Sequence, residues 1–262
     1  GAILIDAHYA ANAAGATCTA RPEDTEIGPD GSLFITFTSG GISKHDGSPD
    51  RRIFTGPDGS ADYEYGWIMQ LTEADNDPAA QTFRWKMVAT GGEPASGGQG
   101  FANPDNLTFD SKGNLWMVTD MSSDKMNRPV RDRTEKGAPM SQSNLRGIFG
   151  NNALWWMPLR DQHAGQLFLF GMGPMDSELT GPCFAADQKT LFLSVQHPGE
   201  INGTRRYFAT EERPFALRTL DGQAFMQQRQ VPIGSNWPGQ QANDPPKPAI
   251  VAIRRVDGQS IV

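Results

Sequence analysis

Three acidic residues lie at related points of a repeated sequence pattern and could together hold a metal ion. Glu23 and Asp105 each follow a proline at the start of a repeat, and Glu178 lies just before the Gly-Pro pair of a looser third copy. Carboxylates that gather in one place repel one another unless a cation neutralises them, and such oxygen-rich sites suit Ca²⁺ or Fe³⁺ better than Zn²⁺. Metal ligation and a structural role in capping turns or pairing with arginine are both open from spacing alone.

A second chemical group adjoins the first of these acids. Arg21 stands two residues before Glu23, and its planar guanidinium could offer parallel donors to a phosphate beside a metal. The structural alternative is a salt bridge from Arg21 to Glu23 or Asp24.

The sequence lacks the spacing that other hydrolase sites require. The four histidines, which show no paired spacing, are His8, His45, His163 and His197. No serine lies in a Gly-x-Ser-x-Gly elbow. Cys18 and Cys183 identify neither a disulfide framework nor a zinc site, and we expect both to be buried packing residues. These patterns argue against serine-hydrolase and zinc-hydrolase chemistry.

The acids belong to an internal repeat, which indicates the fold that must position them. Residues 22–34 align without gaps on residues 104–116, and residues 181–195 form the looser third copy. Each copy leads through a turn into a strand rich in β-branched and aromatic residues. Further strands are expected at 65–71, 82–88, 153–157, 166–170 and 249–253. Elaborated loops between such units are typical of β-propeller blades, whose innermost strands face a central channel.

The predicted fold is therefore all-β, with about three elaborated blades of a β-propeller. Closed propellers use ~4–8 blades, so we expect the chain, residues 1–262, to be a single domain that forms the C-terminal part of a larger ring. The opening apolar run, residues 1–6, resembles a strand, and because the sequence has no initiator Met we expect the natural start to lie upstream. An open arc exposes sheet edges, which favours self-association.

Composition limits the partners. The chain of 262 residues has a net charge of −7 and a pI near 5.1, which argues against nucleic-acid binding. No apolar run approaches the ~20 residues that cross a bilayer, so no membrane interaction is expected. One basic group is expected to be a solvated surface, with substrate steering as the alternative. Its members are Arg128, Arg131, Arg133 and Lys136.

Several ordered segments resemble the C-terminal half of bacterial PhoX-type alkaline phosphatases. They are residues 17–26, 103–107, 150–154, 178–184, 190–199, 234–238 and 248–253. The resemblance implies a six-bladed propeller exported to the periplasm by the twin-arginine pathway, with a Ca²⁺ and Fe³⁺ cluster that hydrolyses phosphomonoesters.

The resemblance also implies roles for individual residues. Glu23, Asp105 and Glu178 are implied metal ligands, Arg21 is an implied phosphate contact, and Asn106 is an implied hydrogen-bonding assistant. The family's N-terminal half, which carries a Cys-Glu-Glu motif that resembles an iron-binding element, is absent here. We therefore expect this part of the protein to be inactive alone.

Two other functions remain open from the sequence. One is a non-catalytic propeller that binds a partner and uses the same carboxylates to hold structural Ca²⁺. The other is a propeller lactonase, which would share the acidic turns and the channel metal. Shared scaffolds support different reactions, so the substrate distinguishes these readings.

Overall fold

The structure is a computed structural model that describes most of the chain. The described residues are 1–19, 21–39, 49–57, 59, 63–122, 125–127, 134–135, 138–139, 149–219, 221 and 223–262. The expected basic group, Arg128, Arg131, Arg133 and Lys136, lies outside them, as does His45. No helix among the described residues is long and apolar enough to span a membrane.

Antiparallel sheets dominate the described chain, which confirms the all-β prediction. The first sheet contains β1 (Pro22–Ile27), β2 (Leu33–Phe37), β3 (Trp67–Glu73) and β4 (Phe83–Thr90) in sequence order. The second contains β5 (Pro104–Phe109), β6 (Leu115–Thr119), β9 (Ala153–Met157) and β10 (Phe168–Met172), again in sequence order. The third contains β11 (Glu178–Phe184), β12 (Leu191–Gln196) and β15 (Ala249–Ile253).

The remaining elements are peripheral to these three sheets. They are α1 (Ala2–Ile5), α2 (Ala7–Ala13), the short ladder of β7 (Thr134–Glu135) and β8 (Ala138–Pro139), the hairpin of β13 (Thr210–Arg218) and β14 (Ala224–Pro232), and single 3₁₀ turns at Ala74–Asn76, Pro94–Ser96 and Arg206–Phe208.

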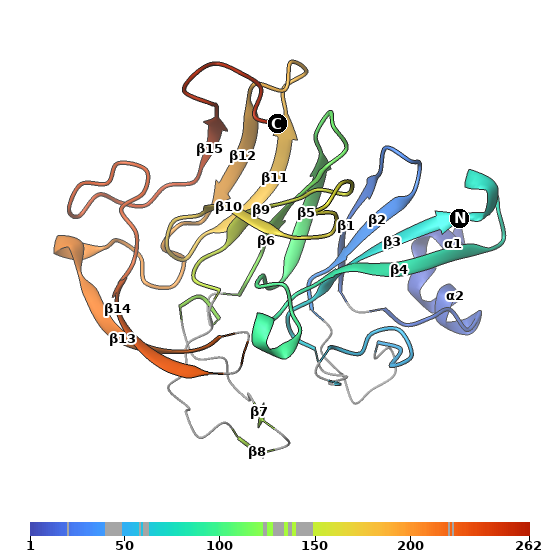
Figure 1. Cartoon of the computed structure of the whole chain (residues 1–262), viewed down its shortest axis with the longest axis horizontal. Helices are drawn as coiled ribbons and strands as arrows, with labels where there is room; N and C mark the ends of the chain where they lie inside the picture. Colours follow the sequence, from blue (N-terminus) through green and yellow to red (C-terminus); the bar gives the residue numbers. More distant parts are fainter. Residues whose placement is uncertain are drawn as a thin grey trace.

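The first strand of each sheet neighbours the first strand of the next. Strand β5 contacts both β1 and β11, and the three sheets spread outward from these strands (Figure 1). The β1–β2, β5–β6 and β11–β12 turns all lie toward the top of that view (Figure 1). The beginnings of β1, β5 and β11 therefore share the opposite end, where the expected ligand residues stand.

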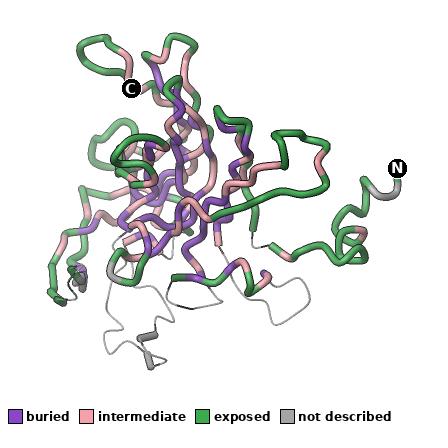
Figure 2. Tube along the Cα trace, turned by 45° about the vertical axis from the view of Figure 1, so that its right-hand side comes forward, coloured by how far each residue is buried: buried purple, intermediate pink, exposed green. Residues whose placement is uncertain are grey.

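The core lies between the sheets and follows the two-residue alternation of β-strands. Strand β6 is buried throughout because both of its faces are covered. Its Leu115 and Met117 pack toward the first sheet, whereas Trp116 and Val118 pack toward the third. Buried positions accordingly gather in the middle of the molecule, and the outer loops are exposed (Figure 2). This packing holds the three inner strands at a fixed spacing.

One sequence-based expectation about local structure is wrong, and one element has no counterpart among the predicted strands. The opening run expected as a strand forms α1, because it has no partner strand, and the alanine-rich α2 follows it directly. The hairpin of β13 and β14 was not expected, because many of its residues are charged or amide-bearing and it lacks the clear apolar alternation of a half-buried strand.

Candidate metal centre

Three carboxylates converge at the shared end of the inner strands. Asp105, Asp120 and Glu178 each offer a carboxylate oxygen, and these oxygens all lie within 4.8 Å of one another. All three residues are partly buried. Among the described residues, this is the group of acids, histidines and cysteines whose geometry could hold a metal ion.

Hairpin pairing explains how residues distant in sequence reach one place. Asp105 lies near the start of β5, and Asp120 follows the end of β6 directly. The two strands are antiparallel, with Pro104 opposite Thr119, so the start of one strand meets the end of the other. The Asp120 amide also donates to the Asn103 carbonyl at 2.9 Å. Glu178 begins β11, which neighbours β5.

A β-bulge redirects the backbone where the acids stand. In the first sheet the register shifts between Pro22 and Thr25, and in the second it shifts between Pro104 and Leu107. The residues inside the two shifts are Glu23 with Asp24, and Asp105 with Asn106. Bulges re-aim side chains and often adjoin functional sites. The bulges free two successive residues in each sheet from the ladder, so their side chains can serve the site.

Burial and crowding raise the pKa values of the three acids. The pKa of Asp105 is raised to about 7, chiefly by burial and then by the neighbouring charges of Asp120 and Glu178. Burial is also the largest cause that raises the pKa of Asp120. Glu178 follows the same pattern, since burial and then the Asp120 charge raise its pKa. In the metal-free chain these groups therefore resist simultaneous ionisation.

Glu178 is held by two side chains of the adjoining strand end. Gln196 donates from Nε2 to Glu178 Oε1 at 2.8 Å, and His197 Nε2 lies 3.3 Å from Oε2. His197 Nδ1 is 3.7 Å from Glu200 Oε2. Both carboxylate oxygens of Glu178 are thus oriented from outside the cluster, as is common around metal ligands.

The first sheet contributes less directly than the sequence suggested. Glu23 lies outside the group of three oxygens, although its charge raises the pKa of both Asp105 and Asp120. Arg21 donates from Nη2 to Glu23 Oε1 at 2.8 Å, and its side chain is 69% exposed. The salt bridge considered as the alternative for Arg21 is therefore present in the structure.

The structure also places the remaining sequence candidates. Asn106 donates weakly from Nδ2 to Asp105 Oδ1 at 3.3 Å, so it adjoins the cluster. Cys18 is half-buried and Cys183 is exposed, and both are free. The expectation of buried packing is wrong for Cys183, because its side chain points away from the core on an alternating strand.

Sequence reasoning missed Asp120, Gln196 and His197. The signal was present: each stands at or just after the end of the second strand of a hairpin whose first strand begins near an expected ligand. Antiparallel pairing brings these positions together. The repeat alone did not show this, because the copies were aligned on their first strands and turns.

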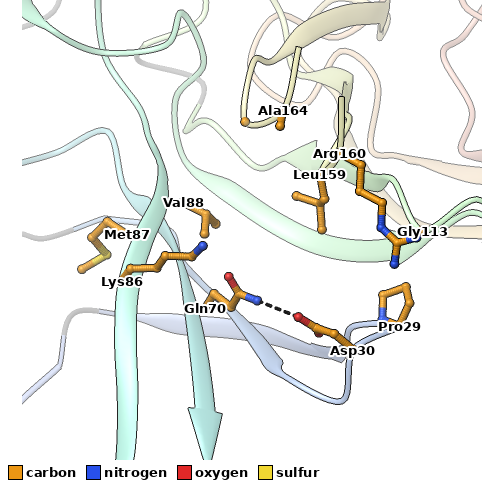
Figure 3. A pocket seen from close by; sticks show the side chains of 11 residues that line it. Pro29, Asp30, Gln70, Lys86, Met87, Val88, Gly113, Leu159, Arg160 and Ala164 are labelled. Carbon is orange, nitrogen blue, oxygen red and sulfur yellow. Dashed lines mark hydrogen bonds between the residues drawn. The ribbon is translucent and has the colours of Figure 1, made fainter. Parts of the chain in front are cut away.

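A separate cavity lies at the other end of the strands (Figure 3). It has a volume of about 420 Å³, and its lining includes Pro29, Asp30 and Gly113 from the hairpin turns. Lys86 and Arg160 also line it, and Gln70 donates to Asp30 at 3.3 Å (Figure 3). This mixture of charges contrasts with the all-carboxylate cluster, so we take the cluster as the candidate functional site.

The donor set fits a hard cation. Carboxylate oxygens are preferred by Ca²⁺ and other oxygen-seeking ions, and a bound cation would relieve the repulsion that raises these pKa values. No sulfur or neutral imidazole belongs to the group of three, which disfavours a zinc site.

Two comparisons with known proteins point to the same family. A family model described as alkaline phosphatase PhoX matches residues 1–199. Among solved structures, Pseudomonas fluorescens PhoX in complex with vanadate, a transition state analogue, matches with a TM-score of 0.69 and 29% sequence identity. The match covers 99% of this chain and 38% of that chain, so this chain spans well under half of that protein's length. A search of curated proteins found no match.

Proposed function

Because the chain belongs to the PhoX alkaline phosphatase family, we propose that it is part of a metal-dependent phosphatase that hydrolyses phosphate monoesters. One observation carries the proposal: Asp105, Asp120 and Glu178 place three carboxylate oxygens within 4.8 Å of one another. A cluster of this kind is costly without cations and suited to them. The solved relative binds vanadate, a transition state analogue, which supports phosphate esters as the substrate class.

We propose that Ca²⁺ and Fe³⁺ are the cations. Bound there, they would neutralise the phosphate oxygens and stabilise charge in the transition state. Asp105, Asp120 and Glu178 would hold them, and Glu23 would join from the first sheet. Gln196 and His197 keep both oxygens of Glu178 oriented, which leaves that carboxylate little freedom to turn away.

Arg21 is the proposed phosphate contact. Its hydrogen bond to Glu23 uses Nη2, and a guanidinium has five N–H donors in a planar fork. The remaining donors are accessible because the side chain is 69% exposed. Glu23 thus orients the guanidinium, while the free edge of the fork can bind two phosphate oxygens.

The wider context is also proposed. The three sheets supply about three blades of a six-bladed propeller, with residues 1–262 as one domain in its C-terminal part. Family resemblance supports export to the periplasm by the twin-arginine pathway. Elements outside this chain would complete the ring and the metal cluster, so this part alone would be inactive.

Alanine substitution combined with elemental analysis tests the proposal. Glu23→Ala, Asp105→Ala, Asp120→Ala and Glu178→Ala should each lower bound Ca²⁺ and Fe³⁺ and, in the complete enzyme, hydrolysis of an aryl phosphate. Asp187→Asn is the matched control, because Asp187 lies in the turn at the far end of the hairpin that carries Glu178. Unchanged metal content in all four alanine variants would refute the proposed site.

A cation-stabilised scaffold without catalysis is the second candidate. The Arg21–Glu23 ion pair favours it, because that pair satisfies the proposed phosphate contact internally. Calcium-dependent melting without hydrolysis of any phosphate ester by the complete protein would support this candidate. The family match lends no support to a lactonase.

A further inference from the structure

Two side chains link the inner strands of neighbouring sheets beside the carboxylates. Asp24 on β1 accepts a hydrogen bond at Oδ2 from the Leu107 amide of β5 at 2.8 Å. Asn106 on β5 accepts one at Oδ1 from the Gly181 amide of β11 at 2.9 Å. The Thr180 hydroxyl also donates to Asn106 Oδ1. Each link therefore joins the backbone of one inner strand to a side chain of the preceding one.

The two links are equivalent in sequence and structure. Asp24 directly follows Glu23, and Asn106 directly follows Asp105. Both pairs stand inside a register shift at the start of their strand. The third sheet differs, because its register shift encloses Gly181 and Pro182, neither of which has a side-chain acceptor. The repeat thus preserves an acceptor at the two positions where this chain has a next inner strand.

We propose that Asp24 and Asn106 are positioning residues that set the spacing of the metal-binding carboxylates. In each bulge the first residue is a proposed metal ligand, and the second accepts a hydrogen bond that fixes the next inner strand. The inference rests on the proposed function, since it concerns the geometry of that cation site.

The hydrogen bonds act very close to the proposed ligands. Asp24 binds the amide two residues after Asp105, so it fixes the strand from which Asp105 projects. Asn106 reaches both sides of the second junction, because it donates to Asp105 Oδ1 at 3.3 Å and binds the Gly181 amide. One side chain therefore connects Asp105 to the strand that begins with Glu178.

This connection opposes the charge repulsion of the cluster. The ligand oxygens of Asp105, Asp120 and Glu178 lie within 4.8 Å of one another, so these carboxylates repel one another when they are ionised. Hydrogen bonds between the strands that carry them would keep their spacing in the metal-free protein. A preorganised site binds more tightly because less ordering is needed when the cation arrives.

Calcium titration calorimetry of paired variants tests the proposal. Asp24→Leu and Asn106→Leu remove the acceptor while keeping a side chain that branches at the same carbon. Loss of residues that orient metal ligands commonly costs about 10- to 100-fold in affinity, and we expect this range. Asp24→Asn keeps an acceptor oxygen and should restore most of the Ca²⁺ affinity. Thermal melting of each variant identifies the temperature range in which it is folded.

A control variant at the opposite end of the inner strands distinguishes an effect on Ca²⁺ affinity from a loss of overall stability. Gln188 accepts a hydrogen bond from the Ser111 amide at 2.9 Å, so it also joins the second and third sheets. Gln188→Asn shortens the side chain and suits the positive φ of 57° at that position. It should lower the melting temperature while Ca²⁺ affinity stays at the unsubstituted level. If a leucine variant fails to fold, Asp24→Ser and Asn106→Ser replace it, because serine is too short to reach the next strand.

The outcomes distinguish this inference from the proposed function. If the unsubstituted complete protein binds neither Ca²⁺ nor Fe³⁺, the proposed cation site is refuted and the inference falls with it. If it binds Ca²⁺ and the folded leucine or serine variants bind equally well, the inference alone is overturned. A narrower difference between Ca²⁺ and Mg²⁺ affinity in these variants would support positioning, because selectivity depends on the size and rigidity of the site.

Discussion

Replacing Asp120 by Asn distinguishes two effects of the carboxylate cluster: its repulsion, which destabilises the metal-free chain, and its attraction for a cation. The substitution nearly preserves shape, and the backbone hydrogen bond from the Asp120 amide to Asn103 remains possible. It removes one negative charge from a group whose ligand oxygens lie within 4.8 Å of one another. We expect opposite effects on the metal-free and cation-bound states, because the same charge repels Asp105 and attracts a cation.

The distance gives the size of both effects. Two unit charges 4.8 Å apart interact by about 3 kcal/mol at an effective dielectric constant of 20. Partial exposure of the site lowers this value, so the metal-free variant should gain about 1 kcal/mol in its free energy of unfolding at pH 8. The lost attraction to a divalent cation is at least as large, and about 1.5–3 kcal/mol corresponds to about 10- to 150-fold weaker Ca²⁺ binding.

The assay combines thermal melting with calcium titration of the same samples. In the presence of chelator, Asp120→Asn should melt at a higher temperature than the unsubstituted chain. With saturating Ca²⁺ the order should reverse or the difference should vanish. Asp187→Asn, at the far end of the β11–β12 hairpin, should change neither comparison. A lower melting temperature in chelator together with unchanged Ca²⁺ affinity would refute the reasoning, since Asp120 would then have a structural role.

Three further predictions follow from the site and the sheet edges. The pKa of Asp105 is raised to about 7 from an ordinary 3.8, so between these pH values the folded metal-free chain holds a proton that the unfolded chain releases. The stability of the metal-free chain should therefore fall as pH rises from about 4 to 7. Added Ca²⁺ should remove this loss, and melting curves at pH 5 and pH 8 with and without Ca²⁺ measure it. Arg21→Ala should weaken vanadate binding by the complete enzyme at least tenfold while bound metal stays constant, and Arg21→Lys should recover only part because lysine lacks the planar fork; equal vanadate affinity in all three proteins would exclude Arg21 as a phosphate contact. Self-association should appear by light scattering at micromolar concentration, because the outer strand β10 exposes Phe168, Leu169 and Met172; a monomer would contradict this expectation.

The sequence predicted the parts of the fold that repeat or alternate. The two well-matched copies became the β1–β2 and β5–β6 hairpins, since their turns and apolar strands carry the necessary local signals. Strands β9 and β15 were predicted at their observed bounds. The hairpin of β13 and β14 was not predicted, because its strands are stabilised mainly by pairing with each other. Such pairing does not require an apolar face toward the core.

The candidate site was partly predictable for a related reason. Asp105 and Glu178 stood out because they begin inner strands, and the structure brings them together. Asp120 depends on the partner strand, so its place follows only once the register of β5 and β6 is known. Glu23 was expected in the cluster on the strength of the repeat. Its sheet lacks an acid opposite it, since the residue after β2 is the buried Thr38.

For the proposed phosphatase, the distribution of charge argues that one divalent cation would be insufficient for catalysis. Asp105, Asp120 and Glu178 carry three negative charges when ionised, and the neighbouring Glu23 is balanced by Arg21. A single Ca²⁺ would therefore leave the centre negative and would repel a phosphate ester dianion. Attraction of the substrate requires additional positive charge, either from a trivalent ion such as Fe³⁺ or from several cations held in part by ligands outside these three sheets. In the proposed phosphatase, activity would therefore depend on a larger cluster than these three acids form, and the proposed positioning hydrogen bonds would prepare the part that this chain supplies.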